Sequence, residues 1–208
     1  MLKRLPISIV LSLLLAGCGL WIIERETYPP VTVKTATQRY AIPADSTYIR
    51  FKQTHLESIQ RLDSLLTMNG RTTSPDRLLQ QGTDYIEVGL PAFAVPPETL
   101  FTNILPTLRV LEEEIEPLIG EVMVVSGYRS RIYNSAAGGA DQSRHLSFDA
   151  VDVVPVTRIP ERILKRRLRQ FWYEKGEEFN LGLGLYDHSR FHIDTWRYRN
   201  WGNWSEDR

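Results

Sequence analysis

The sequence predicts an α+β domain in which a small, mainly antiparallel sheet is packed against helices. Two short apolar runs, 122–125 and 150–154, have the length and the valine content of buried strands. A third segment, 191–194, alternates apolar and polar residues with the period of a half-buried strand. Between positions 101 and 118, apolar residues recur at helical spacing, which predicts a helix with one side facing the core.

The first 17 residues predict a bacterial lipoprotein signal peptide. Lys3 and Arg4 precede an apolar stretch, 7–15, that is too short to span a bilayer. The next residues, Leu15-Ala16-Gly17-Cys18, resemble the lipoprotein box, which implies cleavage before Cys18 and lipidation of that cysteine. Gly19 in place of an aspartate favours the outer membrane of a Gram-negative cell. The alternative is an ordinary cleaved signal or an uncleaved anchor. Cys18 is the only cysteine, so no disulfide can form within the chain.

Residues 18–44 are interpreted as a lipidated N-terminus and a tether, and residues 45–95 as a helical and extended N-terminal extension. One helix is expected from Asp45 to about Asn69, and a short one after Ser74-Pro75. Tyr85–Val95 is expected to be extended. His55 lies beside the apolar side of the first helix and is interpreted as a packed or partly exposed histidine rather than a metal ligand.

Residues 96–204 are expected to form the main domain. A helix from Pro97-Glu98 to Gly120 is predicted to kink or restart at Pro106, and a second helix is predicted from Pro160 to about Phe179. The basic residues of the second helix are interpreted as a charged outer face; binding of anionic lipid or cell-wall polymer is the alternative. Glycines alternating in 182–186 predict a strand with close backbone neighbours. The tryptophans at 196, 201 and 204 either pack over the core or line the substrate groove.

Three polar residues lie in or near these strands. Asp152 lies among valines, and a buried carboxylate costs free energy unless it is paired or bound to a metal. His192 lies between apolar residues, and strand alternation directs it away from them. If the strands are neighbours, both side chains share a face that His145 can reach from the preceding loop. Zinc accepts His nitrogen and Asp oxygen, and catalytic sites keep a position open for water. We therefore hypothesise that His145, Asp152 and His192 hold one Zn²⁺; spacing alone leaves hydrogen-bonded core or surface residues as the alternative.

Several short segments together resemble the zinc D-alanyl-D-alanine carboxypeptidase family. They are Ser126-Gly127-Tyr128-Arg129-Ser130, Tyr133-Asn134, Gly138-Gly139-Ala140, Ser143-Arg144-His145, Ala150-Val151-Asp152 and Phe191-His192-Ile193-Asp194. That family includes D,D-dipeptidases and peptidoglycan endopeptidases and shares its fold with the hedgehog signalling domain. The resemblance covers about residues 97–201. It implies that His145, Asp152 and His192 bind zinc, and that Arg129 contacts the substrate or polarises the scissile carbonyl.

Two positions depart from the family pattern. The glycine three residues after the first zinc-binding histidine is Phe148 here, and this constrains a loop in which glycine could adopt positive φ. Well-studied members carry Glu or Asp, as the general base, three residues before the last zinc-binding histidine; this chain has Ser189 there. Asp187, Asp194 and Asp149 are nearby acidic residues, none of which has the usual spacing.

The expected function is zinc-dependent hydrolysis of peptide bonds in peptidoglycan stem peptides, as a D,D-carboxypeptidase or a D,D- or L,D-endopeptidase. The expected location is the periplasmic side of the outer membrane. Asp187 or Asp194 would shuttle the proton, and Arg129 would stabilise the developing oxyanion or hold a substrate carboxylate. Ser189 favours an alternative, a weakly active or inactive zinc-stabilised lipoprotein that binds peptidoglycan or serves as a scaffold. The chain has 25 basic and 25 acidic residues, and this balance gives no support for nucleic-acid binding.

Overall fold

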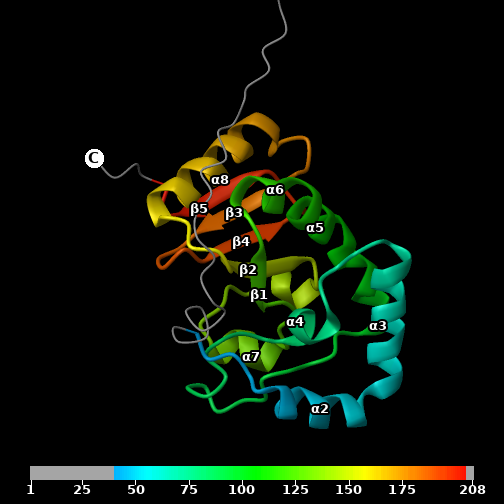
Figure 1. Ribbon diagram of the computed structural model, residues 1–208. Coiled ribbons are helices and arrows are strands. Elements are labelled where there is room, and N and C mark those ends of the chain that lie inside the picture. Colours follow the sequence, from blue (N-terminus) through cyan, green and yellow to red (C-terminus); the bar gives the residue numbers. More distant parts are fainter. Residues whose placement is uncertain (1–39, 205–208) are drawn as a thin grey trace, which may run out of the picture.

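The computed structural model describes residues 40–204 (Figure 1). The predicted signal peptide at 1–17, Cys18 and the predicted tether up to residue 39 lie outside the described residues. None of the helices within 40–204 is both long enough and apolar enough to cross a lipid bilayer.

A five-stranded sheet forms the centre of the described chain, with the strand order β1-β2-β4-β3-β5. The neighbouring pairs are antiparallel except β3 and β5, which are parallel. The strands are β1 (Val122–Ser126), β2 (Ala150–Pro155), β3 (Gly182–Leu185), β4 (Phe191–Asp194) and β5 (Arg199–Gly202). The predicted fold class, α+β with a mainly antiparallel sheet and packed helices, is confirmed. Strand β5 was not predicted, because its alternation over four residues is not distinct from that of a loop.

One face of the sheet packs against helices, and the opposite face carries the polar residues. Alternate residues of β2, β3 and β4 belong to the main hydrophobic core: Val151, Val153, Leu183, Leu185, Phe191 and Ile193. Helices α5 (Ile104–Val110), α6 (Glu116–Ile119) and α8 (Glu161–Lys175) lie together on one side of the sheet in Figure 1. Because successive strand residues point to opposite faces, Asp152 and His192 point away from this core.

The N-terminal extension packs into the same core. Helix α3 (Leu56–Met68) buries Ile59, Leu62 and Leu66, and α4 (Pro75–Leu79) buries Leu78 and Leu79, and all five side chains belong to the main core. The single helix predicted from Asp45 is wrong, since α2 (Asp45–Thr54) ends before His55, which has φ −130°. The His55 ring is exposed and stacks on Phe51, with ring centroids 4.3 Å apart.

Other predicted boundaries also differ from the structure. The helical stretch before β1 is continuous but irregular: η1 (Glu98–Asn103) is a 3₁₀-helix, and η2 (Leu111–Ile115), between α5 and α6, is a π-helix. Pro106 lies in the first turn of α5, where its missing N–H costs no helical hydrogen bond. Residues 85–89 form a turn rather than a strand, and α8 ends at Lys175, before the predicted Phe179.

Candidate metal centre

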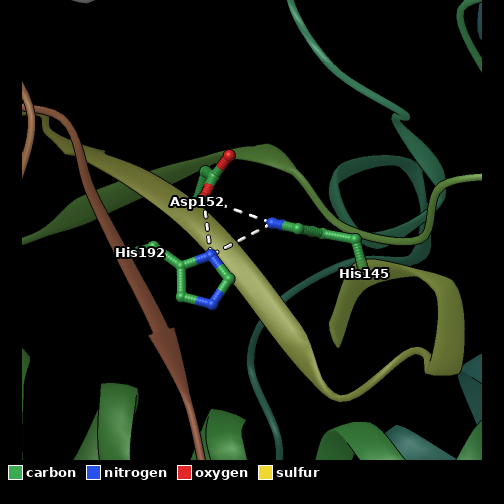
Figure 2. Close-up of side chains that lie close together, drawn as sticks. All are labelled: His145, Asp152 and His192. Carbon is green, nitrogen blue, oxygen red and sulfur yellow. Dashed lines mark hydrogen bonds and ion pairs between the residues drawn. The ribbon is translucent and has the colours of Figure 1, made fainter. Parts of the chain in front are cut away.

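The side chains of His145, Asp152 and His192 meet on the polar face of the sheet (Figure 2). Asp152 of β2 is directly paired with His192 of β4, and His145 comes from the 3₁₀-helix η3 (Arg144–Ser147). His145 Nε2 lies 3.1 Å from His192 Nδ1 and 3.3 Å from Asp152 Oδ1, and His192 Nδ1 lies 2.9 Å from Asp152 Oδ1. All three residues are at most 5% exposed.

Hydrogen bonds on the far side of each ring determine which nitrogen is available as a ligand. His145 Nδ1–H donates to the carbonyl of Gly127 at 2.7 Å, so Nε2 keeps its lone pair. In the neutral His192 ring, an Nε2–H that donates to Asp194 Oδ2 at 3.1 Å leaves Nδ1 with its lone pair. Both lone pairs therefore face Asp152 Oδ1, and a cation is the group that satisfies three such acceptors at once.

The second oxygen of Asp152 is held by two arginines. Arg129 Nη2 donates to Asp152 Oδ2 at 2.7 Å, and Arg190 Nη2 donates to the same oxygen from the other side. This arrangement leaves Oδ1 directed toward the two imidazoles. The carboxylate is thus oriented to offer one oxygen to a metal.

The pKa values of the three groups follow from burial and from these contacts. Burial, helped by the charge of Arg129, lowers the pKa of His145 to about 4. Burial also opposes a charge on His192, but hydrogen bonds to Asp152 and Asp194 outweigh it and raise the pKa of His192. Burial alone would raise the pKa of Asp152, yet the nearby His145 and Arg190 hold it well below its usual value. Near neutral pH, Asp152 is therefore ionised and His145 neutral, as metal binding requires.

The donor set fits zinc. Ligands at about 2.1 Å from a tetrahedral zinc ion lie about 3.4 Å from one another. The three donor–donor distances, 2.9, 3.1 and 3.3 Å, are slightly shorter, so a small outward movement of the side chains accommodates the ion. Two imidazoles and one carboxylate leave one tetrahedral position open, which is the arrangement of catalytic rather than structural zinc sites.

Two glycines of β3 make room for the groups behind the centre. Gly184 lies between His192 and Trp201 in the sheet register, and a Cβ there would lie 2.5 Å from the Trp201 ring. Gly182 likewise lies between Asp194 and Arg199, and a Cβ there would lie 2.5 Å from Asp194 Oδ2. The predicted close approach at these glycines is thus present, and it lets Trp201 pack on His192 at 5.0 Å between ring centroids.

The segment between β1 and η3 is fixed by Gln81. The Gln81 carbonyl accepts hydrogen bonds from Ser126 Oγ at 2.6 Å and from Arg129 Nε at 3.1 Å. The Gln81 side-chain oxygen accepts from the Ser130 N–H at 2.8 Å, next to the start of α7 (Arg131–Ala136). These contacts position the Arg129 guanidinium beside Asp152.

Phe148, which stands where the family pattern has glycine, adopts the left-handed backbone conformation. Its φ is 55° and its ψ is 41°, values that glycine adopts more readily than phenylalanine. The side chain is fully buried and packs edge-on against Tyr128 and Phe101, with centroids 6.1 and 6.4 Å away. Aromatic packing therefore offsets the cost of the left-handed conformation, which is about 1–2 kcal/mol.

The candidate metal centre lies in an open cavity of about 870 Å³. Its walls come from the 137–145 loop, the 186–192 turn and the 196–201 segment, together with Arg129, Asp152 and Tyr40. A cavity of this volume is large enough to admit part of a short peptide.

The acidic residues considered for proton transfer lie in different places. Asp187 is exposed and lines the cavity, and its Oδ1 accepts a hydrogen bond from Asn203 Nδ2 at 2.7 Å. Asp194 is fully buried behind His192 and does not line the cavity. Asp149 pairs with Arg144. Ser189, with φ 62°, lies in the tight turn before β4, and the neighbouring His188 lines the cavity.

Arg190 and Gln81 were not recognised from the sequence as site residues. Arg190 immediately precedes β4 and shares the alternation of His192 and Asp194, so the period of two contained this signal. Gln81 has no comparable signal, because it acts through its backbone carbonyl and a buried amide in an irregular segment.

A family model described as Peptidase M15 matches residues 85–194, which is just over half of the chain. The match includes Arg129 and the three residues of the metal centre. Searches of curated proteins and of solved structures found no significant match.

Proposed function

The chain belongs to the peptidase M15 family, and on this premise we propose that it is a zinc-dependent peptidase that hydrolyses bonds in peptidoglycan stem peptides. The observation that carries the proposal is the convergence of three possible ligand atoms, two imidazole nitrogens and one carboxylate oxygen, in the wall of an open cavity. Zn²⁺ at such a site supplies a Lewis acid and lowers the pKa of bound water to about 7. The bond that is cut is the terminal one for a D,D-carboxypeptidase and an internal or cross-linking one for a D,D- or L,D-endopeptidase.

The arginines at the centre suit substrate binding. Arg129 uses Nε and Nη2 for internal hydrogen bonds, and among residues 40–204 no acceptor contacts its Nη1. Arg190 Nε is buried and has no partner in the same part of the chain. Free N–H groups beside the metal ligands can donate to a scissile carbonyl oxygen as it becomes negative, which is the role proposed for Arg129.

Asp187 and Asp194 are proposed to have different roles. Asp187 is the better proton acceptor because it lines the cavity and is open to water. Asp194 accepts hydrogen bonds from His192, from Arg199 and from the Trp196 N–H, so its carboxylate suits the orientation of His192.

Ser189 favours a second candidate function, zinc-stabilised binding of peptidoglycan without turnover. Its hydroxyl stands where the family resemblance implies an acidic base, and a serine is a poor base near neutral pH. The cavity and the metal centre would serve binding equally well.

Mass spectrometry of muropeptides incubated with the zinc-loaded protein distinguishes the two functions. A peptidase gives new products, identifies the bond and loses activity with chelator and in the His145→Ala variant. Retention on sacculi without any new product supports the binding function and would refute the peptidase. Asp187→Asn is expected to reduce turnover by about 10²–10⁴-fold while leaving retention on sacculi unchanged.

We also propose that the protein is anchored by lipid on Cys18, from the sequence of residues 1–19. Labelling of cells with a radioactive or alkyne fatty acid tests this. Label is expected in the wild-type protein and absent from Cys18→Ala, and an unlabelled wild-type protein refutes the anchor.

A further inference from the structure

The wall of the cavity around the candidate metal centre contains more arginines than aspartates. Five arginines line it, at positions 129, 144, 190, 197 and 199, together with only two aspartates, Asp152 and Asp187. A bound divalent cation increases this positive charge further. A molecule that binds in the cavity is therefore expected to carry negative charge.

Four of these arginines already contact a carboxylate of the chain. Arg129 and Arg190 share Asp152, Arg144 pairs with Asp149, and Arg199 pairs with Asp194. Among residues 40–204, no carboxylate contacts Arg197, and this side chain is exposed at the edge of the cavity. Its guanidinium is thus available to a ligand.

Trp196 positions this free arginine. The Arg197 guanidinium lies over the Trp196 ring, 5.6 Å from its centroid, and Arg144 and Arg199 lie 4.7 and 5.4 Å from the same ring. Trp196 is nevertheless 51% exposed, which leaves part of the indole open to the cavity. An arginine stacked on an aromatic ring loses less side-chain freedom when it binds a carboxylate.

The segment that carries Trp196 and Arg197 is connected to the candidate metal centre by hydrogen bonds. The backbone N–H of Trp196 donates to Asp194 Oδ1 at 3.0 Å, while Asp194 Oδ2 accepts from His192 Nε2. Arg199 bridges the two ends of this loop through both Asp194 oxygens. Hydrogen bonds to Asp194 therefore hold the backbone of this segment next to His192.

We propose that Trp196 and Arg197 form a subsite that binds a carboxylate of the substrate distant from the bond that is cleaved. The inference rests on the proposed function in that the ligand is a peptide entering the cavity. Arg197 donates to the carboxylate, and the open part of the Trp196 indole contacts the aliphatic part of the same residue.

A pair of synthetic stem peptides tests the subsite, one with free side-chain carboxylates and one with these converted to amides. Affinity of the zinc-loaded full chain for each peptide is measured by calorimetry, and cleavage is followed in parallel by mass spectrometry. Where a peptide is cleaved, kcat/KM replaces the affinity. The free-acid peptide is expected to be preferred by about three- to ten-fold, because one partly exposed charged hydrogen bond discriminates the pair.

Arg197→Gln is expected to abolish most of this preference. Arg162→Gln is the matched control, since Arg162 is an exposed arginine of α8 that does not line the cavity. An unchanged preference in Arg197→Gln, an equal loss in Arg162→Gln, or no preference in the wild-type protein overturns the subsite. If neither peptide is cleaved but the preference is present and depends on Arg197, the subsite stands and the peptidase function fails.

Discussion

Asp194 is the residue through which the support of the metal centre can be tested most directly. It is fully buried, and its carboxylate accepts hydrogen bonds from His192 Nε2 at 3.1 Å and from Arg199 Nη2 at 2.7 Å. These contacts hold the pKa of Asp194 down, to about 2, against the effect of burial, which would raise it. Asp194→Asn removes the negative charge with almost no change in shape.

Asp194→Asn is expected to weaken zinc binding through two effects. The neutral amide accepts more weakly from His192 Nε2–H, so the tautomer that leaves Nδ1 free is less favoured. Loss of a nearby negative charge also weakens the attraction for a divalent cation. Loss of such a supporting carboxylate typically costs 10–100-fold in metal affinity, which corresponds to about 1.4–2.7 kcal/mol.

The Kd for zinc is measured by competition with a chromogenic chelator, and thermal melts of the metal-free proteins report folding. Asp149→Asn is the control, because Asp149 is also a buried carboxylate paired with an arginine but contacts none of the three predicted zinc-binding residues. The control is expected to lower the melting temperature while changing the Kd by less than about three-fold. Wild-type zinc affinity in Asp194→Asn, or an equal loss in Asp149→Asn, refutes the role of Asp194.

Three further predictions concern other parts of the site. Because the pKa of His192 is raised, zinc binding should displace a proton from this ring at pH values below that pKa, and the number of protons released is measured by calorimetry in buffers of different ionisation enthalpy. In the metal-free protein, the proton on His192 adds to the free energy of unfolding. This contribution is complete below about pH 6.5 and is lost as pH rises through the raised pKa, so a free energy of unfolding that changes with pH in the opposite direction contradicts the prediction. Gly184→Ala should destabilise the fold by about 1–3 kcal/mol in urea unfolding, since its Cβ would lie 2.5 Å from the Trp201 ring; an unchanged midpoint argues against this packing. Phe148→Gly should cost about 2–4 kcal/mol, because loss of a buried phenyl ring exceeds the relief of its left-handed backbone, and a stabilised variant would show the opposite balance.

The sequence predicted those parts of the site that depend on local alternation. Asp152 and His192 lie among apolar residues at a period of two, and this alone directs both to the polar face of the sheet. The pairing of Asp152 with His192 is a long-range contact. Sequence spacing predicted it only on the condition that the two strands are neighbours in the sheet. The family resemblance implied that these two residues and His145 bind the same metal ion, and in the structure the three side chains lie together.

Long-range hydrogen bonds account for most of what the sequence did not predict. Gln81 holds Arg129 from 48 positions away through its backbone carbonyl, an atom that every residue type provides. Arg190 has a partner, Asp152, that lies 38 positions earlier in the chain. The break of the first helix at His55 is different, since that position shows neither proline nor glycine as a breaker.

Asp194 also links binding at the rim to the metal centre. Its two oxygens contact His192 on one side and the Trp196 N–H and Arg199 on the other, so both regions share one buried carboxylate. Loss of the Asp194 carboxylate is therefore expected to disturb both the orientation of His192 and the position of the segment that carries Trp196 and Arg197. This follows whether the bound peptide is cleaved or only retained, because it depends on the hydrogen bonds of Asp194 and not on the identity of the proton acceptor.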